Sequence, residues 1–187
     1  MGLIIGASIA GVVVLLLLLA IGIYNSLVQL RNSCDEAFST MDVYLKKRFD
    51  LIPNLVETVK GYADHESKTL EAVTAARSAI SSAGSTADKV AGENMLTGAL
   101  KSLFAVAEAY PDLKANTNFM DLQKQLQKIE DDIAQARKYY NGVVKGMNNK
   151  VEMFPSNLFA GIFGFKKYPF FTVADESERD NVKASFA

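Results

Sequence analysis

The sequence contains little from which a metal centre, a disulfide framework or a catalytic site could be built. Among its 187 residues it has one cysteine, Cys34, and one histidine, His65. A single cysteine excludes an internal disulfide and a cysteine metal site. Thr69 stands four residues after His65, where a second helical metal ligand would lie. We therefore interpret His65 as part of a solvated helix face, and Cys34, which lies on an apolar stripe, as a small core residue.

Two further absences concern catalysis and nucleic acids. No glycine-rich phosphate loop follows a strand, and the sequence carries no nucleophile motif. The formal net charge is −1, from 20 basic and 21 acidic side chains, which gives no case for nucleic-acid binding. The sequence therefore predicts a protein that is not an enzyme and needs no cofactor.

Charged side chains are absent from the first part of the chain, where none occurs before Arg31. The uncharged run from Leu3 to Tyr24 would form about 30 Å of helix, which is enough to cross a bilayer core. A cleaved signal peptide fits poorly, because the run is long and has neither a basic beginning nor a small-residue cleavage site. Residues 1–24 are therefore predicted to form a retained transmembrane helix.

The basic residues that follow the span predict its orientation. Arg31 lies just beyond it, and Lys46, Lys47 and Arg48 come slightly later. The positive-inside rule then places the large C-terminal part in the cytoplasm. We expect a single-pass protein of the bacterial inner membrane, with its N-terminus outside and its partner the lipid bilayer.

Small residues recur at four-residue spacing within the span. This spacing lets two helix backbones approach closely in lipid, although glycine and alanine are also simply frequent in membrane helices. The residues predicted to mediate self-association are Gly2, Gly6, Ala7, Ala10 and Gly11.

Proline is scarce, with four in the chain, and no segment alternates with the period of a strand, which favours an all-α fold. Four amphipathic stretches follow the span: one reaches about Phe49, one covers about 53–81, one has its apolar residues from Val90 to Tyr110, and one runs from Phe119 to near Phe154. Ser85 and Asn118 are expected to cap the last two. The stripes predict an up-and-down, antiparallel four-helix bundle over residues 25–153, continuous with the transmembrane helix.

The position of Pro53 decides how the first two stretches connect. Their apolar spacing runs through Pro53 almost unbroken, which would permit one bent helix. Proline inside a helix costs about 3 kcal/mol, however, and it is well placed in the first turn of a new helix. Asp50 lies where a new N-terminus would attract an anion. We therefore predict an interhelical turn at Asp50 and Pro53.

The bundle would then return the chain to the bilayer at residues 154–171, "FPSNLFAGIFGFKKYPFF". Aromatic and basic residues together suit a membrane interface, but the same segment could instead cover the end of the bundle core. The predicted interface residues are Phe154, Leu158, Phe159, Ile162, Phe163, Phe165, Lys166 and Lys167. The polar residues 172–187 are expected to be disordered.

The stretches "YNSLVQLRN", "LKKRFDLIPNLVETVKGYADHE", "AYPDLKANTNFMDLQKQLQKIE", "ARKYYN" and "FPSNLFAGIFGFKK" resemble the LemA family of bacterial membrane proteins. The resemblance covers Tyr24 to about Phe171, with Phe38 in place of the family's usual tryptophan and Cys34 in place of an aliphatic residue. It implies an N-terminal anchor with a short outside tail, four bundled helices and a turn at Pro53. One branch of the family is linked to magnetosome membranes, and other members are loosely associated with signalling or membrane proteases.

Two functional hypotheses follow. The first is a homo-oligomeric scaffold that organises or bends membrane, favoured by the small-residue face, the bundle rooted in lipid and the second lipid-seeking segment. The second is an adaptor that holds a signalling or protease partner at the membrane.

Overall fold

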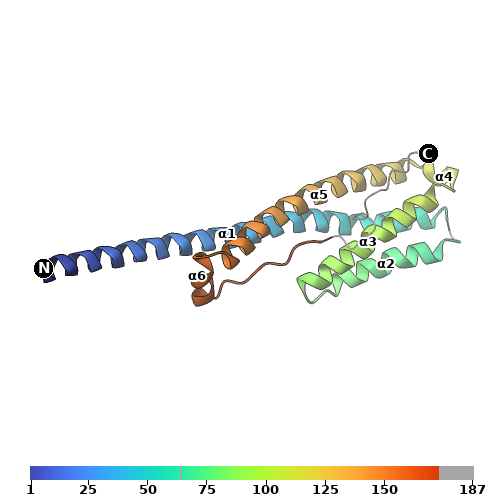
Figure 1. Ribbon diagram of the computed structural model, residues 1–187. Coiled ribbons are helices and arrows are strands. Elements are labelled where there is room, and N and C mark those ends of the chain that lie inside the picture. Colours follow the sequence, from blue (N-terminus) through green and yellow to red (C-terminus); the bar gives the residue numbers. More distant parts are fainter. Residues whose placement is uncertain (64, 173–187) are drawn as a thin grey trace, which may run out of the picture. The chain divides into compact units, whose positions relative to one another are not determined.

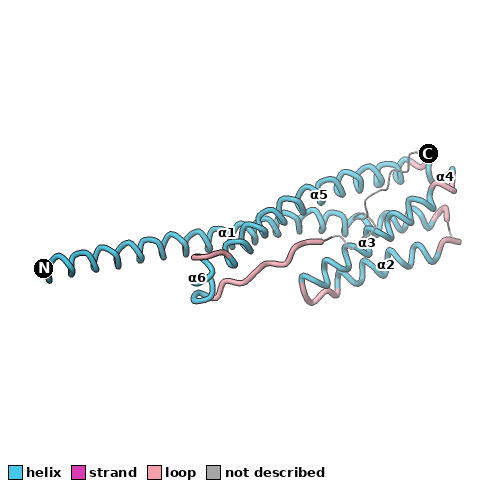
Figure 2. Tube along the Cα trace, viewed as in Figure 1, coloured by secondary structure: helices cyan, strands magenta, loops and turns pink. Residues whose placement is uncertain are grey.

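The structure, a computed structural model, describes residues 1–63 and 65–172. These residues form six helices and no strand (Figures 1 and 2). The all-helical prediction is confirmed, whereas the predicted count of four helices is not. The tail predicted to be disordered lies, except for Thr172, outside the described residues. The helices are α1 (Gly2–Lys60), α2 (Ser67–Ser81), α3 (Thr86–Ala107), α4 (Pro111–Lys114), α5 (Thr117–Glu152) and α6 (Ser156–Phe163).

Helix α1 continues without interruption from the apolar span into the folded part of the chain, as predicted (Figure 1). Among the described helices it is the one long and apolar enough to cross a membrane. Its large apolar side chains are exposed from Ile4 to Ile21. Because no other part of the described chain covers these side chains, they are available to lipid, and the helix is suited to anchor the protein in a membrane.

The predicted turn at Asp50 and Pro53 is wrong, because both residues lie inside α1, which ends at Lys60. The apolar stripe keeps its phase through this region, with Ile52 and Leu55 buried on one face while Pro53 is exposed on the other. A proline in a helix costs about 3 kcal/mol. Burial of each large apolar side chain returns roughly 1.5–3 kcal/mol, so a continuous buried face outweighs the proline.

The chain instead reverses between Lys60 and Ser67. The amide of Ala63 donates to the carbonyl of Val59 at 2.9 Å, which closes the end of α1. His65 lies in this connection and is exposed, so the prediction that it is solvated is confirmed, while its assignment to a helix face is wrong.

The predicted helix caps have mixed outcomes. The hydroxyl of Ser85 accepts a hydrogen bond from the amide of Asp88 at 3.1 Å, which confirms Ser85 as the N-cap of α3. At the start of α5 the cap is Asn116, whose Oδ1 accepts from the amide of Phe119 at 3.0 Å. Asn118 therefore lies inside α5 rather than at its cap, because the helix begins at Thr117, two residues earlier than predicted.

The described chain divides into two compact units. The first combines Met1–Met41 with Gln135–Phe170, and the second comprises Asp42–Ala134 with Phe171 and Thr172. In the first unit α1 and α5 run antiparallel, since Leu30 lies beside Gly146 and Phe38 beside Tyr140. The second unit contains α2 and α3 packed together. Its core contains Ile52, Leu55, Val59, Val73, Leu96, Leu103, Leu113, Phe119 and Leu126.

The continuity of α1 predicts the effect of replacing Pro53 by alanine. Since Pro53 is exposed and helical, Pro53→Ala should raise the free energy of unfolding by about 1–3 kcal/mol. The measurement is urea unfolding of the full chain in detergent, followed by circular dichroism. Glu57→Ala, at an exposed position of the same helix, should stay within about 0.5 kcal/mol. An unchanged or lower stability for Pro53→Ala would instead indicate a turn at this position.

Candidate functional site

Helix α6 exposes apolar side chains to the outside of the first unit. Its inward residues are small, since Ser156 and Ala160 are buried. Leu158, Ile162 and Phe163 are 57%, 76% and 52% exposed. Together with the neighbouring Met153 and Phe154, which are also exposed, they form what we call the apolar surface of this segment. A surface of this kind on a folded unit is typical of a partner or membrane contact.

Aromatic packing holds α6 beside the end of the apolar span. The Tyr24 ring lies 4.9 Å, centroid to centroid, from the Phe163 ring and 5.9 Å from the Phe165 ring, both edge to face. The guanidinium of Arg31 lies 5.8 Å from the centre of the Phe165 ring. Contacts of these geometries are favourable in addition to the apolar area that they bury. The last residue of the uncharged run and the apolar surface of α6 therefore lie side by side.

A glycine in the left-handed helical conformation ends α6 and changes the direction of the chain. Gly164 has φ 72° and ψ 23°, a conformation that glycine adopts without steric cost. The amide of Phe165 then donates to the carbonyl of Ala160 at 2.9 Å. This arrangement is a helix C-cap motif, and it fixes the direction in which residues 165–170 leave the helix.

Side chains of α1 and α5 hold that departing segment in place. Asn148 bonds the backbone of Tyr168 twice, accepting from its amide at 2.8 Å and donating to its carbonyl at 3.0 Å. The hydroxyl of Tyr168 donates to Asp35 at 2.8 Å, and that of Tyr140 donates to the carbonyl of Pro169 at 2.9 Å. Burial, together with the bond to Asp35, raises the pKa of Tyr168 to about 12, so its hydroxyl stays a donor at neutral pH.

The predicted interface residues divide into two groups. Most are exposed, whereas Phe159 and Phe165 are half-buried. Lys167 forms an ion pair with Glu152. The segment thus both packs on the first unit and presents apolar side chains outward, and its place in a membrane interface stays a prediction. The exposed members are Phe154, Leu158, Ile162, Phe163, Lys166 and Lys167.

The small residues of the span are all exposed. Added Cβ atoms at Gly2, Gly6 and Gly11 would meet nothing within 4 Å, and Ala7 and Ala10 are likewise exposed. Larger side chains can therefore be introduced here without disturbing the described chain. Self-association through this face stays a prediction.

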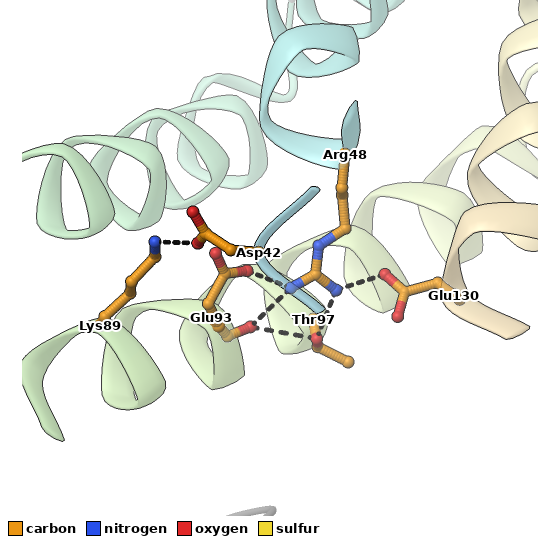
Figure 3. A network of polar contacts seen from close by, with 6 residues as sticks. All are labelled: Asp42, Arg48, Lys89, Glu93, Thr97 and Glu130. Atoms are coloured by element: carbon orange, nitrogen blue, oxygen red, sulfur yellow. Dashed lines mark hydrogen bonds and ion pairs between the residues drawn. The ribbon is translucent and has the colours of Figure 1, made fainter. Parts of the chain in front are cut away.

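A buried arginine network in the second unit was missed by sequence reasoning (Figure 3). Arg48 is fully buried in α1 and forms ion pairs with Glu93 of α3 and Glu130 of α5. It also donates to the hydroxyl of Thr97 at 3.0 Å. Beside this network Lys89 pairs with Asp42. Lys46 and Lys47, which directly precede Arg48 in the sequence, are instead exposed.

The two carboxylates of the network differ in their exposure to water. Glu93 is 1% exposed, and burial raises its pKa against the opposing effect of Arg48. Glu130 is 36% exposed, because it borders an open groove of about 560 Å³ between α3 and α5. A buried charge is tolerated only when its hydrogen bonds are made. Four N–H groups of Arg48 have partners, while its Nε makes no bond within the described chain.

The apolar spacing contained a signal for this network. Arg48 lies three residues after Leu45 and four before Ile52, both on the buried stripe. Glu93 similarly precedes the buried Leu96 by three residues. A buried charge needs an opposite charge as its partner. A basic residue on the apolar stripe of one helix and an acidic residue on the stripe of another could therefore have been predicted to form an ion pair.

His65 and Cys34, the two residues considered as metal ligands, form no metal site within the described chain. No group of three or more His, Cys, Asp or Glu side chains suited to a metal occurs within residues 1–63 and 65–172. Cys34 is buried, as predicted for a core residue, and burial raises the pKa of its thiol. A raised pKa disfavours the thiolate that reactive cysteines need.

Comparison with known proteins identifies relatives over most of the chain. The LemA family model matches residues 37–186. Protein LemA of Metamycoplasma hominis is 27% identical, over 92% of this chain and 82% of its own length. Magnetosome protein MamQ 2 of Paramagnetospirillum magneticum is 28% identical, over 79% of this chain and 64% of its own length. Magnetosome protein MamQ of Magnetospirillum gryphiswaldense is 26% identical over the same shares. None of these names states an enzymatic activity.

The buried network predicts a strongly asymmetric mutational effect. Arg48→Met leaves Glu93 buried without its cation and should lower the free energy of unfolding by about 3–5 kcal/mol. The double variant Arg48→Met/Glu93→Leu should recover most of that loss, because no buried charge remains unpaired. Urea unfolding in detergent measures both.

Lys46→Met serves as the matched control, since Lys46 pairs with Asp50 at an exposed position and should cost less than about 1 kcal/mol. An Arg48→Met variant no less stable than Lys46→Met would show that the network contributes nothing.

Proposed function

This chain belongs to the LemA family, and we propose that it self-associates through its span and scaffolds or shapes the membrane without catalysing a reaction. It is a membrane-associated helical protein, with an apolar helix suited to anchor it. The proposal adds that α6 lies in the lipid interface beside the span. The observation that carries it is the exposed apolar surface of α6 next to Tyr24.

The two apolar surfaces support this proposal together. The span can hold the protein in the bilayer core, while Ile162 and Phe163 project from a helix fixed at its end. An apolar helix lying in one leaflet displaces lipid there and responds to curvature. Several copies joined through their spans would displace lipid at neighbouring points, which is a physical basis for shaping a membrane.

Orientation and localisation are part of the proposal. Arg31, Lys46 and Lys47 follow the span, and the positive-inside rule then favours a cytoplasmic bundle in the bacterial inner membrane. The MamQ relatives described above bear the name magnetosome protein. That name applies to those proteins, and it is compatible with a role at membranes for this one.

Reconstitution of the full chain into liposomes tests the proposal. We expect light scattering in detergent to give a mass of several subunits, and electron microscopy to show altered vesicle shapes. Gly6→Leu should reduce both effects, because a bulky side chain separates the helix backbones. Val12→Leu, on the opposite side of the helix by its spacing, should change neither.

A wild-type monomer that leaves vesicles unchanged would contradict the proposal. If crosslinking in cells then recovered one dominant foreign protein, the adaptor hypothesis would replace it.

A further inference from the structure

Three cationic side chains and two carboxylates lie next to the apolar surface of the first unit. Arg31 is the first charged side chain of the sequence, and the first acidic residue is Asp35. From Met153 to Thr172 the charged residues are Lys166 and Lys167. Asp35 already accepts a hydrogen bond from Tyr168, and Glu152 already pairs with Lys167. The hydrogen bond leaves Asp35 charged, so that among Arg31, Asp35, Glu152, Lys166 and Lys167 the three cations outnumber the two carboxylates by one.

Two of these cations lie at the depth of lipid headgroups if Tyr24 marks the end of the span. Arg31 follows Tyr24 by two turns of helix, about 10 Å along the axis. The headgroup layer extends about 5–8 Å beyond the hydrocarbon core on each side. Helical side chains lean toward the N-terminus, so Arg31 reaches back toward the span. Lys166 directly follows Phe165, which contacts Tyr24, and is exposed.

Packing restricts the guanidinium of Arg31 before any lipid arrives. It lies 5.8 Å from the centre of the Phe165 ring, and Phe165 is itself fixed by Tyr24 and by its backbone bond to Ala160. A side chain that is already positioned loses less conformational entropy when it binds a ligand. Arginine is also well suited to phosphate, since its planar fork donates two parallel hydrogen bonds.

We propose that Arg31 and Lys166 bind the phosphate of anionic phospholipids, so that the protein prefers these lipids over zwitterionic ones. The inference rests on the proposed place of α6 in the interface, which brings both cations to the headgroups. The ligand is a phospholipid rather than free phosphate, because the cations adjoin the apolar surface made by Ile162 and Phe163, which would contact its acyl chains.

Quenching of a single tryptophan by brominated lipids tests this preference. The chain contains no tryptophan, so Ile162→Trp introduces a unique reporter at an exposed position of α6 that leaves the Tyr24 contacts intact. The full chain is reconstituted in mixed bilayers of phosphatidylglycerol and phosphatidylcholine, with either lipid brominated. We expect brominated phosphatidylglycerol to quench several-fold more effectively than its share of the bilayer requires, and less so at high salt.

Charge-neutralising variants of this reporter protein identify the residues responsible. A basic side chain near a membrane surface contributes about a fivefold preference at most. Arg31→Gln and Lys166→Gln should each lower the preference about two- to fivefold, and the double variant further. Arg31→Lys should retain most of it. Lys138→Gln removes the same charge from an exposed position of α5, further from the span, and should change nothing.

Four results would overturn the inference, and they are distinguishable. Equal quenching by the two brominated lipids, or full preference in the double variant, would show that these cations select no lipid. Loss of the preference in inorganic phosphate, but not in chloride of equal ionic strength, would assign the cations to free phosphate. Absence of quenching by either lipid would place α6 outside the bilayer and contradict the proposed function as well.

Discussion

The packing of Tyr24 against Phe163 and Phe165 is the constraint on which the functional account depends. It joins the end of the apolar span to a helix that lies far away in the sequence. The hydrogen bonds of Asn148 and Tyr140 hold the segment that follows α6. The aromatic contacts with Tyr24 and the hydrogen bonds to the segment after α6 both hold this helix, so its exposed apolar side chains keep one position relative to the span. In water, exposed apolar side chains held in this position raise the free energy of the protein. At a membrane surface the same side chains contact lipid, which lowers it.

The buried arginine network has a different role, which is to fix the register of two helices within the second unit. An apolar seam alone tolerates sliding of one helix past another, since similar side chains recur every three or four residues. Arg48 and Glu93 remove that freedom, because a shift of one turn would leave two buried charges unpaired. The network therefore fixes the register of α3 on α1 in that unit. Glu130, open to water at the groove, adds a second carboxylate beside Arg48 at a lower desolvation cost than a buried one.

The sequence was sufficient to predict the features that depend on periodicity. The stripe from Phe119 to Met147 faces inward over most of its length, and α1 extends the span without a break. The turn at Pro53 was predicted wrongly because the intrinsic cost of proline is local, whereas the burial that outweighs it depends on three-dimensional packing. The burial of Arg48 was missed for a similar reason, since its neighbours Lys46 and Lys47 are solvated and its partners are distant in sequence.

For the candidate site, the sequence identified the aromatic segment but not its position. Residue types predicted that 154–171 would prefer an interface, whereas only the fold shows that Phe163 meets Tyr24 and that Ile162 points outward. The path by which the chain reaches this segment also differs from the predicted one, because the chain reverses after Lys60 rather than at Pro53. Contacts between side chains that are far apart in the sequence do not affect the residue spacing within either segment. The position of the aromatic segment beside Tyr24 could therefore be found only from the structure.

The most direct test of the central claim is the depth of α6 in a bilayer. A spin label at Ile162→Cys, in a Cys34→Ala background, reports its collisions with oxygen, which enters lipid, and with a nickel chelate, which stays in water. A label at Asn157→Cys, an exposed polar position of the same helix, is the reference. The account predicts that the label at 162 collides mainly with oxygen and the label at 157 mainly with the chelate. Equal access of the chelate to both positions would contradict it.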